Sequence, residues 1–288
     1  MLADNGFKKM SKMVNPLDIP VVNGGVFVPP PALSEIVTRN VVLAATLEPI
    51  GDKPGCTTRY TDMKPSKALE YFITAGVNIG PAFTHLTDHL LSNKTSEAIY
   101  RYYVEAIAYS KANRAGGKIN QGIIEPLIPI AAAIVLSDPK AEKSPGYVLR
   151  EAKAVMKTKS RYNVEKLVEG KKFANALSKF TKHPVGEYDV GSVYEYYEAD
   201  LEDAKAQGAH KSVSFNGEYV DGFPRIARAY QTIKTSKSPK LMDKTVDAYL
   251  ELFKASPGAP IGVGSAADYI ACAIFLYLSY AKDKIVVV

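Results

Sequence analysis

Residues 123–136 read IIEPLIPIAAAIVL, and this stretch decides the fold. Apolar side chains lie on every side of a helix with this sequence, which is typical of a helix at the centre of a bundle. Two prolines interrupt it, Pro126 and Pro129, and we expect them to bend the helix or to delay its start. A long apolar helix in the middle of the chain requires other helices to cover it.

Amphipathic helical patterns surround this central stretch on both sides in the sequence. Ser34, Ser66 and Thr95 are candidate N-caps for three helices that precede it. The same periodicity predicts helices over residues 145–158, 163–180, 192–208, 241–254 and 265–281. The fold class is therefore all-α: a single-domain multi-helix bundle over residues 33–288, preceded by an irregular arm over residues 1–32 that can hold a β-hairpin at 21–28.

The composition excludes several classes of protein. A net charge of +6 favours polyphosphate partners modestly, but no basic run carries interleaved aromatic residues, so we expect no nucleic-acid partner. The most apolar segment, residues 270–278, is too short to span a bilayer, and we expect a soluble protein with no membrane partner. Two cysteines without a CxxC pair indicate a reducing, cytoplasmic location. The sequence leaves the oligomeric state open.

The first of three glycine-containing polar stretches runs from Glu48 to Asp62. Between these acids lie Lys53 and Arg59, on either side of the turn-forming Pro54-Gly55. Cations and exposed backbone N–H groups suit a polyphosphate, and the flanking carboxylates suit its magnesium ion. The alternative is a charged connecting loop held by local ion pairs.

The other two stretches each lead into an apolar helix. Residues 116–122 contain Lys118 and Asn120 and place glycines before a helix N-terminus, where free N–H groups can face an anion. The third stretch, residues 256–268, leads into a helix expected to start at Ser265, with Asp268 in its first turn. An acid there also suits the helix dipole, so a purely structural role stays open. Helical bundles assemble sites from facing elements, so we expect the three stretches to share one pocket.

These stretches resemble motifs of the triphosphoribosyl-dephospho-CoA synthase family. Glu48, followed by Lys53-Pro54-Gly55, is similar to the family's E-x(4)-K-P-G motif. Asn120, Gly122 and the proline-containing apolar helix after them resemble its N-T-N-x-G motif. Gly264-Ser265-Ala266-Ala267-Asp268, preceded by Ser256-Pro257-Gly258, resembles its S-P-G-G-S-A-D motif. The order and approximate spacing of the three motifs also agree.

The resemblance implies a transferase that moves the triphosphoribosyl group of ATP to the 2′-hydroxyl of dephospho-CoA and releases adenine. It implies ATP as a substrate and Mg²⁺ as its companion, with Glu48, Asp62 and Asp268 as candidate catalytic acids and magnesium ligands. Which of the three is the base stays open. The substrate-binding residues that it implies are Lys53 and Arg59 as a phosphate clamp, together with Gly55, Lys118, Asn120, Gly122 and Ser265.

Two alternatives remain open from the sequence. Residues 236–255 offer only Lys237, Lys240, Asp243 and Lys244 where the family has a longer basic motif, which favours a related ribosyl or nucleotidyl transferase with another acceptor. A nucleotide-binding protein without catalytic activity is the other alternative. Adenine release from ATP, with and without dephospho-CoA, distinguishes the three.

Overall fold

The computed structural model of the protein describes residues 32–112, 114, 118–137, 144–157, 165–167, 169, 170, 174, 218, 222–254 and 261–280. The predicted hairpin at 21–28, the predicted helix at 192–208 and most of the predicted helix at 163–180 lie outside these residues.

Every regular element in the described residues is a helix, which confirms the all-α prediction. The elements in chain order are α1 (Leu33–Leu47), η2 (Glu48–Ile50), η3 (Pro65–Lys67), α2 (Leu69–Asn78), α3 (Gly80–Asn93), α4 (Tyr100–Lys111), α5 (Gln121–Leu136), α6 (Pro145–Lys157), α10 (Pro224–Thr235), α11 (Leu241–Lys254) and α12 (Val263–Tyr280).

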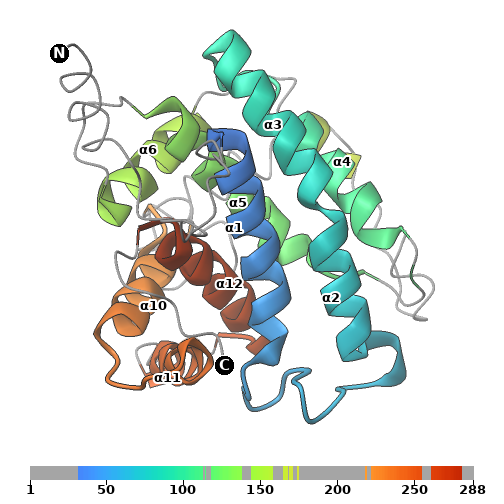
Figure 1. The fold of residues 1–288 in the computed structure, drawn as a ribbon, viewed down its shortest axis with the longest axis vertical. Coiled ribbons are helices and arrows are strands. Elements are labelled where there is room, and N and C mark those ends of the chain that lie inside the picture. Colours follow the sequence, from blue (N-terminus) through green and yellow to red (C-terminus); the bar gives the residue numbers. More distant parts are fainter. Residues whose placement is uncertain are drawn as a thin grey trace, which may run out of the picture.

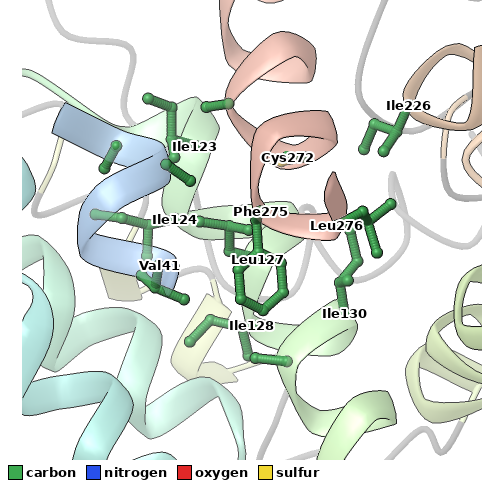
Figure 2. Packing of buried hydrophobic residues seen from close by; sticks show 14 of the residues in the cluster. Val41, Ile123, Ile124, Leu127, Ile128, Ile130, Ile226, Cys272, Phe275 and Leu276 are labelled. Carbon is green, nitrogen blue, oxygen red and sulfur yellow. The ribbon is translucent and has the colours of Figure 1, made fainter. Parts of the chain in front are cut away.

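Helix α5 lies at the centre of the bundle, as its sequence predicts. All of its residues from Ile123 to Val135 are buried. Figure 2 shows Leu127 of α5, Phe275 of α12 and Val41 of α1 in the same buried cluster. The prolines do not delay the helix, which begins at Gln121 and continues through both of them. Helices on every side hold α5 in place, which offsets the main-chain hydrogen bonds that the two prolines remove.

Helix α1 separates two groups of helices. In Figure 1 it crosses the front of the molecule, with α2 and α3 on one side and α12 on the other. Helices α10 and α11 pack against α12 and against each other. This arrangement brings the residues after α1 close to the start of α12, although more than 200 residues separate them in the sequence.

The three predicted helix caps are wrong. Helix α1 begins one residue before Ser34, and the Glu35 carboxylate accepts the N–H of Ala32 at 3.0 Å. Ser66 lies within the short η3 turn that precedes α2. Thr95 accepts a hydrogen bond in the turn ahead of α4, five residues before that helix starts. Ser and Thr side chains also stabilise turns, so their presence alone does not fix a helix start.

The sequence patterns did not predict α3 or α10. Helix α3 begins at Gly80-Pro81 and α10 begins at Pro224, after Gly222. Both starts look like loop sequence, because glycine and proline usually interrupt regular structure. Proline in the first turn is nevertheless favourable, since its missing N–H has no partner within the helix there.

Helix α12 is the one described helix that is long and apolar enough to cross a membrane by length and composition. However, 61% of that segment is buried inside the protein. Its side chains from Tyr269 to Leu278 belong to the hydrophobic core, where they contact α1, α5, α10 and α11. These contacts give α12 the role of a core helix.

Candidate functional site

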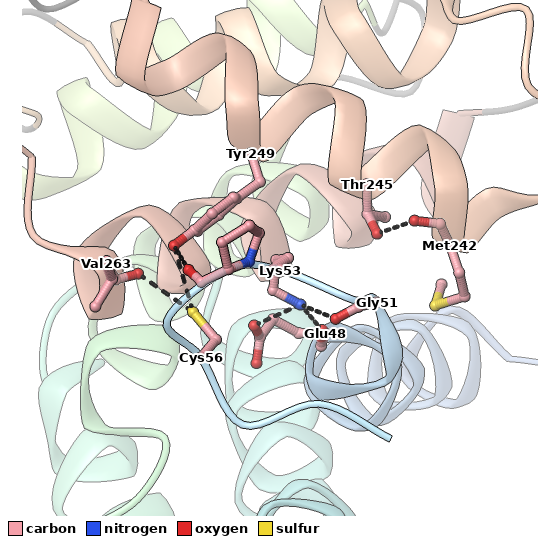
Figure 3. Close-up of polar contacts among 9 residues, drawn as sticks. Glu48, Gly51, Lys53, Cys56, Met242, Thr245, Tyr249 and Val263 are labelled. Atoms are coloured by element: carbon pink, nitrogen blue, oxygen red, sulfur yellow. Dashed lines mark hydrogen bonds and ion pairs between the residues drawn. The ribbon is translucent and has the colours of Figure 1, made fainter. Parts of the chain in front are cut away.

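The first polar stretch is anchored by an ion pair inside the protein. Lys53 Nζ lies 3.1 Å from Glu48 Oε1, and both side chains are almost completely buried. The same ammonium group donates to the backbone carbonyls of Glu48 and Gly51 (Figure 3). Burial raises the pKa of Glu48, while the charge and hydrogen bond of Lys53 act in the opposite direction. The structure therefore places Lys53 in the local ion pair that the sequence left as the alternative to a phosphate clamp.

The turn after Lys53 is attached to α11 and α12. The hydroxyl of Tyr249 donates to the carbonyl of Pro54 at 2.8 Å, and Cys56 Sγ lies 3.5 Å from the same hydroxyl (Figure 3). Gly55 has a φ of +79°, and a Cβ at this position would lie 3.3 Å from Val263 Cγ1. The turn needs glycine both for its backbone conformation and for its close approach to α12.

Asp268 lies where the second and third stretches meet. A Cβ added to Gly122 would lie 2.0 Å from Asp268 Oδ2, so the carboxyl group packs directly on the first turn of α5. The residue as a whole is half-buried, and its carboxyl group lies against Gly122. Burial, followed by the charge of Glu48, raises the pKa of Asp268 from 3.8 to about 8. A carboxyl group with this pKa is mostly protonated at neutral pH.

The charges of two lysines act on Asp268. The charges of Lys67 and Lys118 both act to lower the pKa of Asp268, which places them in its electrostatic environment. Lys118 is a predicted site residue. Lys67 was not predicted; its carbonyl accepts the hydroxyl of Thr57 at 2.7 Å, which holds η3 against the first stretch. No sequence motif marks Lys67, because only this loop contact brings it to the site.

Glu125 is a further acid that the sequence reading missed. It is 4% exposed and lies in α5, and its charge raises the pKa values of Asp268 and Tyr103. The sequence did hold a signal for it, since Glu125 is the one acid in an otherwise apolar run of 14 residues. An acid is seldom retained in such a run without a specific partner or function.

Asp62 and Arg59 lie on the exposed part of the loop. The Asp62 carboxylate accepts the N–H of Leu69 at 2.9 Å, so it occupies the N-terminus of α2. The guanidinium of Arg59 stacks over the exposed ring of Tyr60 at 4.7 Å. Among the residues that the structure describes, no group of three His, Cys, Asp or Glu side chains could hold a metal ion. The three predicted magnesium ligands are therefore not brought together, because Asp62 caps a helix instead.

The start of the last helix differs from the prediction. Helix α12 begins at Val263 rather than Ser265, so Asp268 lies in its second turn. The helix dipole acts mainly within the first turn, which weakens the purely structural explanation of this acid. Ser265 is half-buried in the first turn of α12. Gly116, Gly117 and residues 256–258 lie outside the described part of the chain.

A comparison with protein families identifies the chain. The sequence model of the ATP:dephospho-CoA triphosphoribosyl transferase family matches residues 34–257. The chain belongs to this family. It is accordingly a transferase of the triphosphoribosyl-dephospho-CoA synthase type. No curated protein and no solved structure matches the chain.

The transferase match covers the first two polar stretches and ends at residue 257, just inside the third. It contains Glu48, Lys53, Lys118, Asn120 and Gly122, whereas Ser265 and Asp268 lie beyond it. The contact between Gly122 and Asp268 joins the third stretch to the matched region. The fold thus places Asp268, which lies outside the matched residues, against Gly122, which lies within them.

Replacing Gly122 by Ala is expected to lower kcat by about 100-fold, because its methyl group would displace the Asp268 carboxyl group. We expect a loss of stability of about 1–3 kcal/mol from the added volume. Steady-state kinetics and thermal unfolding measure the two effects. Gly146→Ala in α6 is the matched control, since nothing lies within 4 Å of a Cβ there. Full activity in Gly122→Ala would show that the position of Asp268 does not matter for the reaction.

Proposed function

We propose that this transferase moves the triphosphoribosyl group of ATP to the 2′-hydroxyl of dephospho-CoA, with release of adenine. The observation that carries the proposal is the meeting of Asp268 with Gly122 within the electrostatic reach of Glu48 and Lys118. These residues come from all three polar stretches, and the family match supplies the reaction class.

The reaction is a substitution at the anomeric carbon of the ATP ribose. A bond forms between the acceptor's 2′-oxygen and C1′, and the bond from C1′ to N9 of adenine breaks. Such substitutions pass through an oxocarbenium-like transition state, and paired carboxyl groups assist them in glycoside hydrolysis. The acceptor hydroxyl must lose a proton, and the departing adenine must gain one.

Asp268 is assigned as the acid and Glu48 as the base. A carboxyl group with a pKa of about 8 holds a proton at neutral pH and can donate it to the departing adenine. Glu48 is paired with Lys53, which favours its ionised form, and burial raises its pKa, which makes it a stronger base than an exposed glutamate. Lys53 is then a positioning residue for Glu48.

Lys118 and Lys67 are the proposed triphosphate contacts nearest to Asp268, and the exposed Arg59 can add a third cation. Gly122 and Ser265 lie in the first turns of α5 and α12, where backbone N–H groups can face an anion. Magnesium is expected to arrive with ATP, since Mg²⁺ commonly takes most of its ligands from phosphates and water. We assign no protein ligand to it.

A cytoplasmic location is part of the same proposal. Cys56 and Cys272 are both free thiols, which suits a reducing compartment. ATP and a coenzyme A precursor are small soluble nucleotides, so the proposed reaction needs neither a membrane nor a nucleic acid.

Adenine release from ATP tests the proposed function. Purified protein is incubated with ATP and Mg²⁺, with and without dephospho-CoA, and adenine and the adduct are measured by chromatography and mass spectrometry. We expect adenine only in the presence of dephospho-CoA, in equal amount to a triphosphoribosyl adduct. Release that requires a different acceptor would favour the related transferase, and no release with any acceptor would reject the proposal.

A further inference from the structure

Asn120 has a buried side chain whose hydrogen-bonding capacity is unused. The residue is 5% exposed and immediately precedes α5. Within the described part of the chain, neither Nδ2 nor Oδ1 of its carboxamide has a hydrogen-bond partner. An asparagine at this position usually accepts a backbone N–H of the first helical turn, but this one makes no such capping bond.

Backbone conformation explains the choice of residue only in part. Asn120 has a φ of +62°, and asparagine tolerates this left-handed region better than most residues. Glycine would serve the backbone equally well without burying a polar group. Leaving a buried donor or acceptor without a partner costs about 1–3 kcal/mol. A buried carboxamide that neither caps the helix nor pairs locally therefore calls for a functional explanation.

The position of Asn120 indicates where its partner would come from. Lys118, two residues earlier, contributes to the electrostatic environment of Asp268. Gly122, two residues later, is in direct contact with the Asp268 carboxyl group. Asn120 thus lies between two residues of the candidate site, at the point where α5 and α12 meet.

The chemistry of the carboxamide restricts the ligand. It offers one acceptor and two donors on neighbouring atoms. A phosphate group only accepts, so it would leave Oδ1 without a partner. The adenine edge with the 6-amino group offers a donor next to an acceptor ring nitrogen, and asparagine pairs with it through two hydrogen bonds.

We propose that the Asn120 carboxamide recognises the adenine edge of a bound adenosine nucleotide through the 6-amino group and the adjacent ring nitrogen. This inference rests on the proposed function, in which both substrates, ATP and dephospho-CoA, contain adenosine. It adds a base-reading residue to the site, which the charged residues around Asp268 do not provide. Either ATP or dephospho-CoA can supply the base, and the experiment separates the two.

The test is a comparison of binding by isothermal calorimetry. The first arm compares ATP with purine riboside triphosphate, which lacks the 6-amino group, and the second compares dephospho-CoA with the matching purine analogue. We expect wild-type protein to bind the adenine compound about 5- to 150-fold more tightly in at least one arm. In Asn120→Gly, which suits the left-handed backbone, this ratio should fall to about 1.

Controls keep a structural role distinct from recognition. A purely structural effect of Asn120→Gly would weaken both members of each pair equally and leave their ratio unchanged, which would overturn the proposal. Equal binding of both compounds by wild-type protein in both arms would overturn it without any variant. Lys94→Gly replaces an exposed left-handed residue at the end of α3 and should keep the wild-type ratio. These ratios need no catalysis, so they stay informative if adenine release is not observed.

Discussion

Replacing Asp268 by Asn is expected to lower kcat by about 100- to 10,000-fold, the usual contribution of a general acid. Asparagine keeps the size of the side chain beside Gly122 but cannot donate an acidic proton. Nucleotide affinity should change much less, because Lys118 and Lys67, the proposed triphosphate contacts, are retained. Single-turnover measurements of adenine release, together with ATP titration, separate the two effects. A variant with near-normal kcat would remove Asp268 from the chemical step.

The pH dependence of kcat and of stability should also show whether Asp268 is protonated in the folded enzyme. Because the acid must be protonated, kcat of the wild-type enzyme should fall as pH rises through about 8. The folded state binds a proton at Asp268 more tightly than the unfolded state, whose aspartate has an ordinary pKa of 3.8. The free energy of unfolding should therefore decrease as pH rises from about 4 to about 8. Asp268→Asn should lose this part of the slope, which thermal unfolding across that range measures.

Replacing Lys53 by Met is expected to destabilise the protein by about 3–5 kcal/mol. Methionine has a similar length, but it leaves Glu48 buried without its positive partner and removes two hydrogen bonds to backbone carbonyls. Chemical denaturation measures the loss. Adding Glu48→Gln to Lys53→Met should recover part of the stability, because the unpaired buried charge is then removed. Unchanged stability of Lys53→Met would contradict the buried ion pair.

Arg59→Ala is the matched comparison for Lys53. Arg59 is exposed and stacks on Tyr60, so its replacement should change stability by about 0.5 kcal/mol or less. If Arg59 contacts the triphosphate, the same substitution should weaken ATP binding by about 10- to 150-fold. The sequence treats the two cations alike, as a single clamp. Lys53 is buried in an ion pair, whereas Arg59 is exposed, so we expect the first substitution to change stability and the second to change ATP binding.

Local sequence patterns predicted helices correctly where the spacing of apolar residues itself determines which side chains are buried. The apolar run at 123–136 became the buried central helix, and 241–254 is helical with the predicted bounds. The patterns failed at the ends of helices, as with Ser34 and Ser66, because many polar side chains can satisfy the first turn. They also failed at α3 and α10, whose proline-containing starts look like loops. The division into an arm over residues 1–32 and a domain over 33–288 remains a prediction.

The sequence by itself determined the all-α class, the position of the central helix and the polar stretches that carry the family motifs. These features depend on side chains that are close in sequence, so periodicity and composition are enough to predict them. Only the tertiary structure decided which charges meet. It placed Asp268 against Gly122, turned Asp62 to the start of α2, buried Lys53 beside Glu48, and left the Asn120 carboxamide without a partner. A pKa and an ion pair depend on burial and on neighbours from distant segments, and these exist only once the helices have packed.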